Sequence, residues 1–256
     1  MSVPQKTFSI PRSHARSHSW ARRQWGALRK RWLRLRYGDA EFVVEYFGAR
    51  FACRLADGVG KGVALNTYDH RQLSLMLEEA RREKPDLFLD IGANFGLYAC
   101  ILARNGAVAH AIAFEPDRRN EAQLRANIAR NGLDEIVAVE PLALGPQTGE
   151  ARLAEGPASN RGASRLVDGE DDEASYTVPV RRLDDLVALT GARILAKIDV
   201  EGREAGVLAG MERLLRENRC FLQIEAFSDS HVAILEACGY MRLGAIANDQ
   251  FWSRRD

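Results

Sequence analysis

Short apolar runs alternate with longer amphipathic segments through the last two thirds of the chain. The segments between the runs repeat apolar side chains at the three- and four-residue spacing of a helix. Each run is short enough for a buried strand, and the runs fall near residues 87–91, 111–114, 136–139, 194–200 and 220–226. Strands that alternate with helices in this way are typical of a doubly wound α/β fold, in which helices cover both faces of a mostly parallel sheet. We expect residues 240–243 and 251–252 to supply the last two strands.

The pattern in the N-terminal third predicts a hairpin and a helix. Residues 41–55 alternate around Phe47-Gly48-Ala49, as two antiparallel strands joined by a tight turn do. Residues 66–84 carry apolar side chains on one helical face and end before a proline, which cannot continue a helix. Later in the chain, residues 203–218 predict one helix and residues 176–181 a strand.

Residues 20–37 predict a basic amphipathic helix. Trp25, Leu28, Trp32 and Leu35 share one face, and arginines fill the other. Such a helix is typical of a peripheral contact with anionic membrane lipids. Two alternatives stay open: the tryptophans pack on the rest of the protein, or the helix belongs to a targeting segment, which is also rich in Arg and poor in acids. No nucleic-acid motif accompanies the charge, so we expect no nucleic-acid partner.

Charge divides the chain into two parts. Of its 36 Lys and Arg residues, ten fall within residues 1–38, which contain no acid, so the remainder carries 26 basic against 35 acidic residues. We therefore expect residues 1–38 to form a basic N-terminal arm and residues 39–256 a single domain. No stretch approaches the roughly 18 apolar residues of a membrane span. The expected location is the cytoplasm, with peripheral contact at the inner membrane face through the arm.

The four cysteines stand alone in apolar segments, at Cys53, Cys100, Cys220 and Cys238. No Cys-x-x-Cys pair with nearby histidines indicates a zinc site, and we expect no bound metal. Isolated apolar cysteines are typical of reduced core residues, which again favours the cytosol.

A glycine turn follows the first core strand, and an acid ends the next strand. The chain passes from Asp90 through Gly92 and Gly96 into a helical pattern and then reaches Glu115. Strand, glycine turn, helix, strand and acid are typical of a nucleoside site, where glycine allows a close backbone approach and the acid accepts hydrogen bonds from ribose. The alternative is that Asp90 and Glu115 only cap the helices that follow them.

The glycine spacing narrows the kind of nucleoside. It is G-x-x-x-G instead of the G-x-G-x-x-G that holds a pyrophosphate, which argues against NAD or FAD and favours S-adenosylmethionine (SAM). We expect the end of the third strand to lie beside the adenine. The predicted cofactor-binding residues are Asp90, Gly92, Ala93, Asn94, Gly96, Glu115, Pro116 and Ala143.

Charged residues interrupt the fourth core strand and end the fifth. Lys197 and Asp199 are two positions apart, so they face the same side of the strand. An ion pair that only satisfies itself would explain them, since an unpaired buried charge is costly. The strand also ends at the edge where such sheets bind ligands, however, so we predict catalytic roles for Lys197, Asp199, Glu201 and Glu225.

The segment of residues 145–173 is rich in Gly, Pro, Ser and Asp and is too long for an ordinary connection. We predict that Asn160 and Ser164 on this segment bind the acceptor substrate. Its composition does not reveal which acceptor.

Together these motifs resemble the FkbM-type methyltransferases over roughly residues 40–245. The resemblance is carried, in order, by Asp90-Ile-Gly-Ala-Asn-Phe-Gly-Leu-Tyr, Phe114-Glu-Pro, Ala143-Leu-Gly, Asn160-x-Gly-x-Ser164, Lys197-Ile-Asp-Val-Glu-Gly and Ile224-Glu225. It implies a seven-stranded, Rossmann-like class I SAM-methyltransferase fold, with methyl transfer to a hydroxyl oxygen of a sugar in a surface polysaccharide, glycolipid or secondary metabolite. One departure is Tyr68-Asp69, where the family often has Tyr-Glu, which puts cofactor contact by Asp69 in question.

A sugar hydroxyl is a poor nucleophile, so its proton needs an acceptor. We expect Asp199 to be that base, with Glu201 second and Lys197 as the group that orients Asp199. Three carboxylates could instead bind a divalent cation that acidifies the hydroxyl. Two other classes stay open: a nucleotide-linked oxidoreductase, and a SAM-binding or membrane-associated scaffold without turnover.

Overall fold

The computed structural model describes residues 20–167, 175–226 and 228–254, and the side chains from residue 26 onward. Its central sheet has the strand order β12-β13-β11-β10-β3-β4-β5, and in these residues all neighbours are parallel except those of β13. The strands are β3 (Leu87–Ile91), β4 (Ala111–Phe114), β5 (Val137–Glu140), β10 (Arg193–Ile198), β11 (Arg219–Glu225), β12 (Tyr240–Ile246) and β13 (Asp249–Arg254). This confirms the seven-stranded, mostly parallel sheet.

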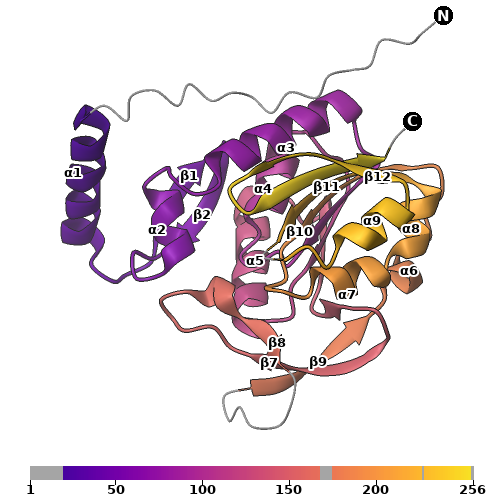
Figure 1. Ribbon diagram of the computed structural model, residues 1–256. Coiled ribbons are helices and arrows are strands. Elements are labelled where there is room, and N and C mark those ends of the chain that lie inside the picture. Colours follow the sequence, from indigo (N-terminus) through magenta and orange to yellow (C-terminus); the bar gives the residue numbers. More distant parts are fainter. Residues whose placement is uncertain (1–19, 168–174, 227, 255–256) are drawn as a thin grey trace, which may run out of the picture.

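Helices cover both faces of this sheet (Figure 1). One face packs on α3 (His70–Glu83), α4 (Leu97–Arg104) and α5 (Arg118–Asn131), and the other on α6 (Leu183–Leu186), α7 (Glu204–Ala209), α8 (Glu212–Glu217) and α9 (Val232–Ala237). Successive strand residues alternate between the two cores: Phe88 and Leu195 join the first, Leu89 and Ala196 the second. The same alternation places Asp90 and Lys197 side by side on the α3–α4 face, where they are register partners.

The predicted hairpin forms from β1 (Phe42–Tyr46) and β2 (Ala49–Cys53). Amide side chains of α5 bind the outer edge of β2: Asn127 accepts from Ala52 N and Gln123 donates to Ala52 O. A short helix that the sequence pattern did not predict follows, α2 (Gly58–Ala64), capped by Asp57. The predicted helix over residues 66–84 begins later, at His70.

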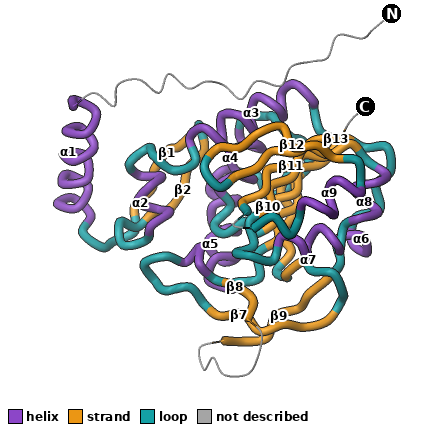
Figure 2. The backbone as a smooth tube through the Cα atoms, in the orientation of Figure 1, coloured by secondary structure: helices purple, strands orange, loops and turns teal. Residues whose placement is uncertain are grey.

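Residues 20–37 form the predicted amphipathic helix, α1 (Trp20–Tyr37). It contacts the rest of the protein through buried Leu33 and through Tyr37, whose ring stacks on Phe42 with centroids 4.5 Å apart. Trp32 is 58% exposed, so the alternative in which it packs on the body is not what the structure has. The side chain of Trp25 lies outside the described part. The helix stands at one end of the molecule (Figures 1 and 2), and no helix of the described ranges is long and apolar enough to cross a bilayer.

Two parts of the fold differ from the pattern-based expectation. The single helix expected over residues 203–218 is interrupted between α7 and α8, where a Cβ on Gly210 would lie 2.1 Å from the carbonyl oxygen of Gly145. The expected strand over residues 194–200 ends at Ile198, which leaves Asp199 just beyond it.

The segment of residues 145–173 contributes to a second, four-stranded sheet. Its order is β6-β9-β7-β8, built from β6 (Ala143–Leu144), β7 (Gly149–Ala154), β8 (Arg165–Val167) and the predicted strand β9 (Ser175–Arg181). Figure 2 shows β7, β8 and β9 as a separate layer beside the carboxyl ends of the central strands. Residues 1–19 and 168–173 lie outside the described residues, and the division of the chain at residue 38 stays a prediction. All four cysteines are buried and free, as predicted.

Candidate functional site

A cavity of about 440 Å³ lies at the carboxyl ends of β3, β4, β10 and β11, with residues 160–166 as one of its walls. Ten of the residues selected from the sequence line it: Gly92, Asn94, Glu115, Pro116, Ala143, Asn160, Ser164, Asp199, Glu201 and Glu225. The other four, Asp90, Ala93, Gly96 and Lys197, are outside its lining. The structure thus brings the predicted groups together, while the role of each stays a prediction.

The glycine turn is shaped by a close approach of two chain segments. Gly92 has φ +79°, and a Cβ there would lie 1.8 Å from the carbonyl oxygen of Asp199. Gly96 has φ +84°, and its Cβ would lie 2.4 Å from the side chain of Leu124. Any other residue would be both strained and crowded at these two positions. The turn therefore fixes the spacing between the first and the fourth core strands.

Asp90 lies behind this turn. Its Oδ2 accepts a hydrogen bond from Ala99 N at 2.9 Å, in the first turn of α4. That is the bond that the helix-capping interpretation of Asp90 requires. Burial raises the pKa of Asp90 to about 6.

Glu115 is held by two backbone N–H groups, one on each carboxylate oxygen. Oε2 accepts from Asn94 N at 2.7 Å, and Oε1 accepts from Asp117 N at 2.8 Å. Burial raises the pKa of Glu115 to about 8. The side chain that caps α5 is Asp117, which accepts from Arg119 N and Asn120 N. Glu115 is thus not the cap of α5, contrary to the capping alternative.

Lys197 and Asp199 form an ion pair, with Nζ 2.6 Å from Oδ2. The ammonium group is buried and also lies over the ring of Tyr98, 4.9 Å from its centroid. Although burial lowers it, the nearby carboxylates, Asp199 first, raise the pKa of Lys197 above its ordinary value. The ion pair that would explain these two charges without a catalytic role is thus present, and it lies at the edge of the cavity.

Two further carboxyl groups lie beside Asp199. Burial and then the charge of Asp199 raise the pKa of Glu225 to about 8. Burial, followed by the charge of Asp199, also raises the pKa of Glu201. The backbone of Glu201 is in the left-handed region, with φ +53°. Burial, with the charge of Asp199 as the second cause, therefore keeps a proton on Glu225 near neutral pH.

Buried polar groups support this cluster from behind. The Tyr98 hydroxyl donates to Asp69 Oδ2 at 3.0 Å and accepts from Gln223 Nε2 at 2.9 Å. Gln223 Nε2 also donates to Asp249 Oδ1 at 2.7 Å. Asp69, whose contact with the cofactor was in question, is absent from the cavity lining, whereas its neighbour Tyr68 belongs to it.

Sequence reasoning missed several residues of the cavity: Tyr68, Asn120, Arg165 and Arg203 line it. Tyr68 had a signal, the Tyr-Asp pair ahead of the predicted helix. Arg165 had none, because its approach depends on how the second sheet folds back. Arg203 follows Glu201-Gly202 directly at the start of α7, so its place in the sequence was a signal.

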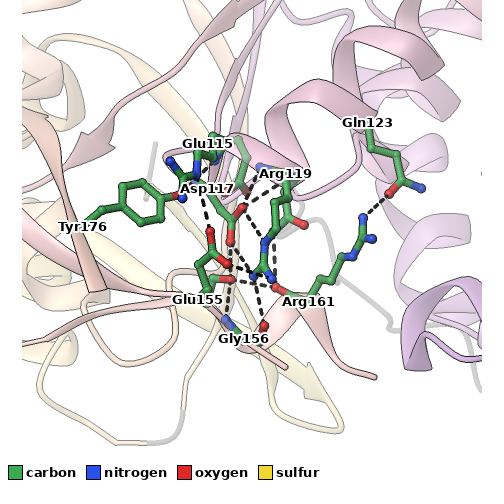
Figure 3. A network of polar contacts seen from close by, with 11 residues as sticks. Glu115, Asp117, Arg119, Gln123, Glu155, Gly156, Arg161 and Tyr176 are labelled. Atoms are coloured by element: carbon green, nitrogen blue, oxygen red, sulfur yellow. Dashed lines mark hydrogen bonds and ion pairs between the residues drawn. The ribbon is translucent and has the colours of Figure 1, made fainter. Parts of the chain in front are cut away.

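The segment that carries Asn160 and Ser164 is tied to the start of α5 by a polar network (Figure 3). Arg119 joins Asp117 and Glu155 with nitrogen–oxygen distances of 3.0 Å each, and it donates to Gly156 O at 2.9 Å. Arg161 donates to Gln123 Oε1 at 3.3 Å. One wall of the cavity is therefore held by the helix that follows Glu115.

The sequence model described as Methyltransferase FkbM domain matches residues 90–242, more than half of the chain. This chain belongs to that family. It is a SAM-dependent methyltransferase, and SAM is its cofactor. The match confirms the resemblance drawn from the motifs.

The known proteins that this methyltransferase resembles include a curated relative and solved structures. Hexuronic acid methyltransferase AglP of Haloferax volcanii is 28% identical over 227 residues, which are 87% of this chain and 86% of AglP. The tRNA methyltransferase TrmK of B. subtilis is 13% identical with a TM-score of 0.44, over 72% of this chain and 65% of TrmK. Streptococcus pneumoniae Sp1610 in complex with SAM is 18% identical with a TM-score of 0.41, over 72% and 70%. The chain thus spans just under two thirds of TrmK.

The residues at the cavity fit this cofactor. Gly92, Asn94 and Glu115 line one part of the cavity together. Each oxygen of Glu115 accepts one backbone hydrogen bond among the described residues and has a further lone pair, as two ribose hydroxyls would need. Within the described ranges, no three His, Cys, Asp or Glu side chains are grouped as metal ligands.

Proposed function

We propose that this enzyme methylates a hydroxyl oxygen of a sugar, in a surface polysaccharide, a glycolipid or a secondary metabolite. The observation that carries the proposal is the meeting of Asp199, Glu201 and Glu225 at the cavity that also contains Gly92 and Glu115. A hydroxyl acceptor needs a group that takes its proton, and this cluster supplies one beside the cofactor residues. The likeness to AglP, named as acting on a hexuronic acid, supports a sugar as the acceptor.

The residues of the chain have separate tasks in this proposal. Bound SAM supplies an electrophilic methyl group on its sulfonium. Glu115 and the turn at Gly92 hold the nucleoside, and Asp199 accepts the proton of the sugar hydroxyl. Lys197 fixes Asp199 through the 2.6 Å ion pair. Glu225, with its pKa raised to about 8, holds a proton near neutral pH and so limits the charge of the cluster.

The test is transfer of labelled methyl from SAM to oligosaccharides that contain hexuronic acid and to neutral oligosaccharides. Asp199→Asn should bind SAM as the wild type does and lose roughly 10²–10⁴-fold in kcat, the usual contribution of a general base. Asp134→Asn, at an exposed acid outside the cavity lining, is the matched control and should be fully active.

The chemistry of the product decides the acceptor atom. A methyl ether survives mild base, whereas a methyl ester on the hexuronic carboxylate is hydrolysed. A base-labile product would overturn the hydroxyl proposal, and an active Asp199→Asn variant would place the base elsewhere. Absence of transfer to sugars and to extracted glycans and lipids would overturn the proposal of a sugar acceptor.

We also propose that α1 rests on an anionic membrane surface, which would bring the enzyme to a glycolipid acceptor. Its apolar residues Leu28, Trp32 and Leu35 are 58%, 58% and 79% exposed. The helix has seven Lys or Arg residues and no acid. An exposed apolar face with surrounding positive charge suits the boundary between anionic headgroups and acyl chains.

A further inference from the structure

Residues 155–164 run from the end of β7 along the cavity, and besides the contacts of Arg119 and Arg161 one serine holds both ends of this segment. The Ser164 hydroxyl lies 2.6 Å from Asp117 Oδ2 and accepts a hydrogen bond from Gly156 N at 2.9 Å. It also lies 3.0 Å from Arg161 O. Both ends of the segment are therefore joined at this one side chain.

A hydroxyl has only one proton to give. In Ser164 the short contact with a carboxylate is the stronger of the two possible donations, because charge-assisted hydrogen bonds are shorter and stronger than neutral ones. The Ser164 hydroxyl donates its one proton in the hydrogen bond to Asp117 and accepts a hydrogen bond from Gly156 N. It therefore has no proton left to donate to an acceptor substrate. Its position in the cavity wall then has a different use.

Asp117 connects this serine to the predicted ribose-binding acid. Its backbone N–H donates to Glu115 Oε1, while its side chain caps α5 and accepts from Ser164 and Arg119. The side chain is 0% exposed. Although burial raises it, hydrogen bonds from Arg119 and Ser164 hold the pKa of Asp117 below its ordinary value. One residue thus fixes the carboxylate and the wall beside it.

We propose that Asp117 and Ser164 are positioning residues for the cofactor: their hydrogen bond is a clasp that holds residues 155–164 against bound SAM and slows its release. Glu115 then selects the nucleoside, and the clasp sets how long it stays. The inference rests on SAM as the cofactor and not on the identity of the acceptor. It assigns Ser164 a role through Asp117 and Gly156, in place of direct contact with the acceptor.

The experiment measures SAM binding without acceptor, so a failure of the proposed sugar methylation would not affect it. Labelled SAM is bound to the full-length protein and its release is followed after dilution into excess unlabelled SAM. Ser164→Ala should speed release about tenfold with little change in the association rate, since a hydrogen bond to a charged group is worth roughly that factor or more. Ser164→Thr, which keeps the hydroxyl, should restore slow release.

Ser159→Ala is the matched control, because Ser159 is an exposed serine of the same segment whose hydroxyl has no hydrogen bond among the described contacts. It should release SAM at the wild-type rate. Asp117→Asn, which loses the charge and keeps the size, should speed release as Ser164→Ala does. Thermal unfolding without cofactor separates this effect from general damage.

Two results would overturn the clasp. One is wild-type SAM release from folded Ser164→Ala, above all if that variant had a raised KM for the acceptor, as direct acceptor contact would require. The other is equal acceleration in Ser164→Ala and Ser164→Thr, which would show that the hydroxyl is not what holds the segment.

Discussion

At the scale of single residues, Glu115 combines burial with hydrogen bonds that a charged carboxylate prefers. The N–H groups of Asn94 and Asp117 favour the charged form, yet burial outweighs them and raises the pKa to about 8. At pH 7 much of the free enzyme therefore has Glu115 protonated. Ribose hydroxyls donate to a carboxylate, and the sulfonium is a cation, so SAM should favour the charged form.

We therefore predict that SAM binding releases a proton and becomes tighter as pH rises. Below pH 8 the free enzyme holds a proton that the complex gives up, so affinity should rise by up to about tenfold per pH unit and level off above pH 8. Calorimetry from pH 6 to 9, in buffers of different ionisation enthalpy, measures both effects.

Glu115→Gln tests the assignment, because its side chain has the same size and no titration. It should bind SAM more weakly and with little pH dependence over this range. If the variant kept the wild-type pH profile, the released proton would come from another group and Glu115 would not be the linked residue.

The carboxylates of the candidate site could be predicted from sequence because strand ends place residues at one edge. Asp90, Glu115, Asp199 and Glu225 each lie within one residue of the end of a core strand, and parallel strands bring their carboxyl ends together. The bond between Ser164 and Asp117 could not be predicted. It joins positions 47 apart in sequence through a segment without periodicity.

At the scale of elements, α1 was predicted as a helix but not in its packing. Periodicity identified the face of Trp25, Leu28, Trp32 and Leu35, whereas the side chains that contact the body are Leu33 and Tyr37. A hydrophobic pattern shows which residues share a face and does not show what covers it. The exposed face is the basis of the membrane proposal.

We predict that replacing Leu28, Trp32 and Leu35 together by Ser reduces binding to vesicles that contain anionic lipid by at least about tenfold, since buried apolar area supplies much of interfacial affinity. Wild-type binding should be strong to vesicles with phosphatidylglycerol, weak to pure phosphatidylcholine, and reduced by salt, because each Lys or Arg near the surface contributes on the order of 1 kcal/mol. Co-sedimentation measures these differences.

The matched control replaces three exposed apolar residues on other elements by Ser, namely Val43, Leu186 and Met241. It should bind vesicles as the wild type does, and both variants should keep SAM binding. Equal vesicle binding by the α1 variant and the wild type would contradict the membrane proposal. If the wild type instead formed dimers at high protein concentration and the α1 variant did not, a second copy of the chain would be what covers this face.

Two elements show why local pattern was insufficient. The interruption between α7 and α8 lies at Gly210, which packs against Gly145 far away in sequence, a contact that local pattern does not reveal. The strands β7 and β8 lie in a Gly- and Pro-rich segment, and their pairing with each other and with β9 defines them more than their own residues do.

At the scale of the whole molecule, burial and charge conflict at one edge of the sheet. The core faces are apolar, while at the carboxyl ends of the strands Asp69, Asp90, Asp199 and Glu225 interact with the buried ammonium of Lys197, and Glu115 is buried nearby. Sequence predicted the sheet because its apolar runs agree with the fold. The same sheet retains costly charges at the edge where the site lies, as functional sites do.

This conflict predicts a stability that falls as pH rises. Burial raises the pKa of Asp69 and Asp90 to about 6, of Glu79 to about 7, and of Glu115 and Glu225 to about 8, above their ordinary values of 3.8 and 4.5. Between pH 5 and 8 the folded protein therefore binds more protons than the unfolded chain, so the free energy of unfolding decreases with pH. Lys197, whose pKa is raised, and Asp117, whose pKa is lowered, keep their charges throughout this window.

Denaturant unfolding without cofactor at pH 5.5, 7 and 8.5 measures the free energy of unfolding. Thermal unfolding at the same pH values is a second measurement, in which each 1 kcal/mol lost should lower Tm by roughly 2–4 °C. Glu225→Gln should flatten part of the slope, because its neutral amide cannot lose a proton as pH rises. Saturating SAM should oppose the loss, since binding becomes tighter over the same range in which the free protein weakens. Stability that instead increased toward pH 8.5 would mean that these carboxyl groups are charged in the folded protein at neutral pH, and the proton that limits the charge around Asp199 would then be absent.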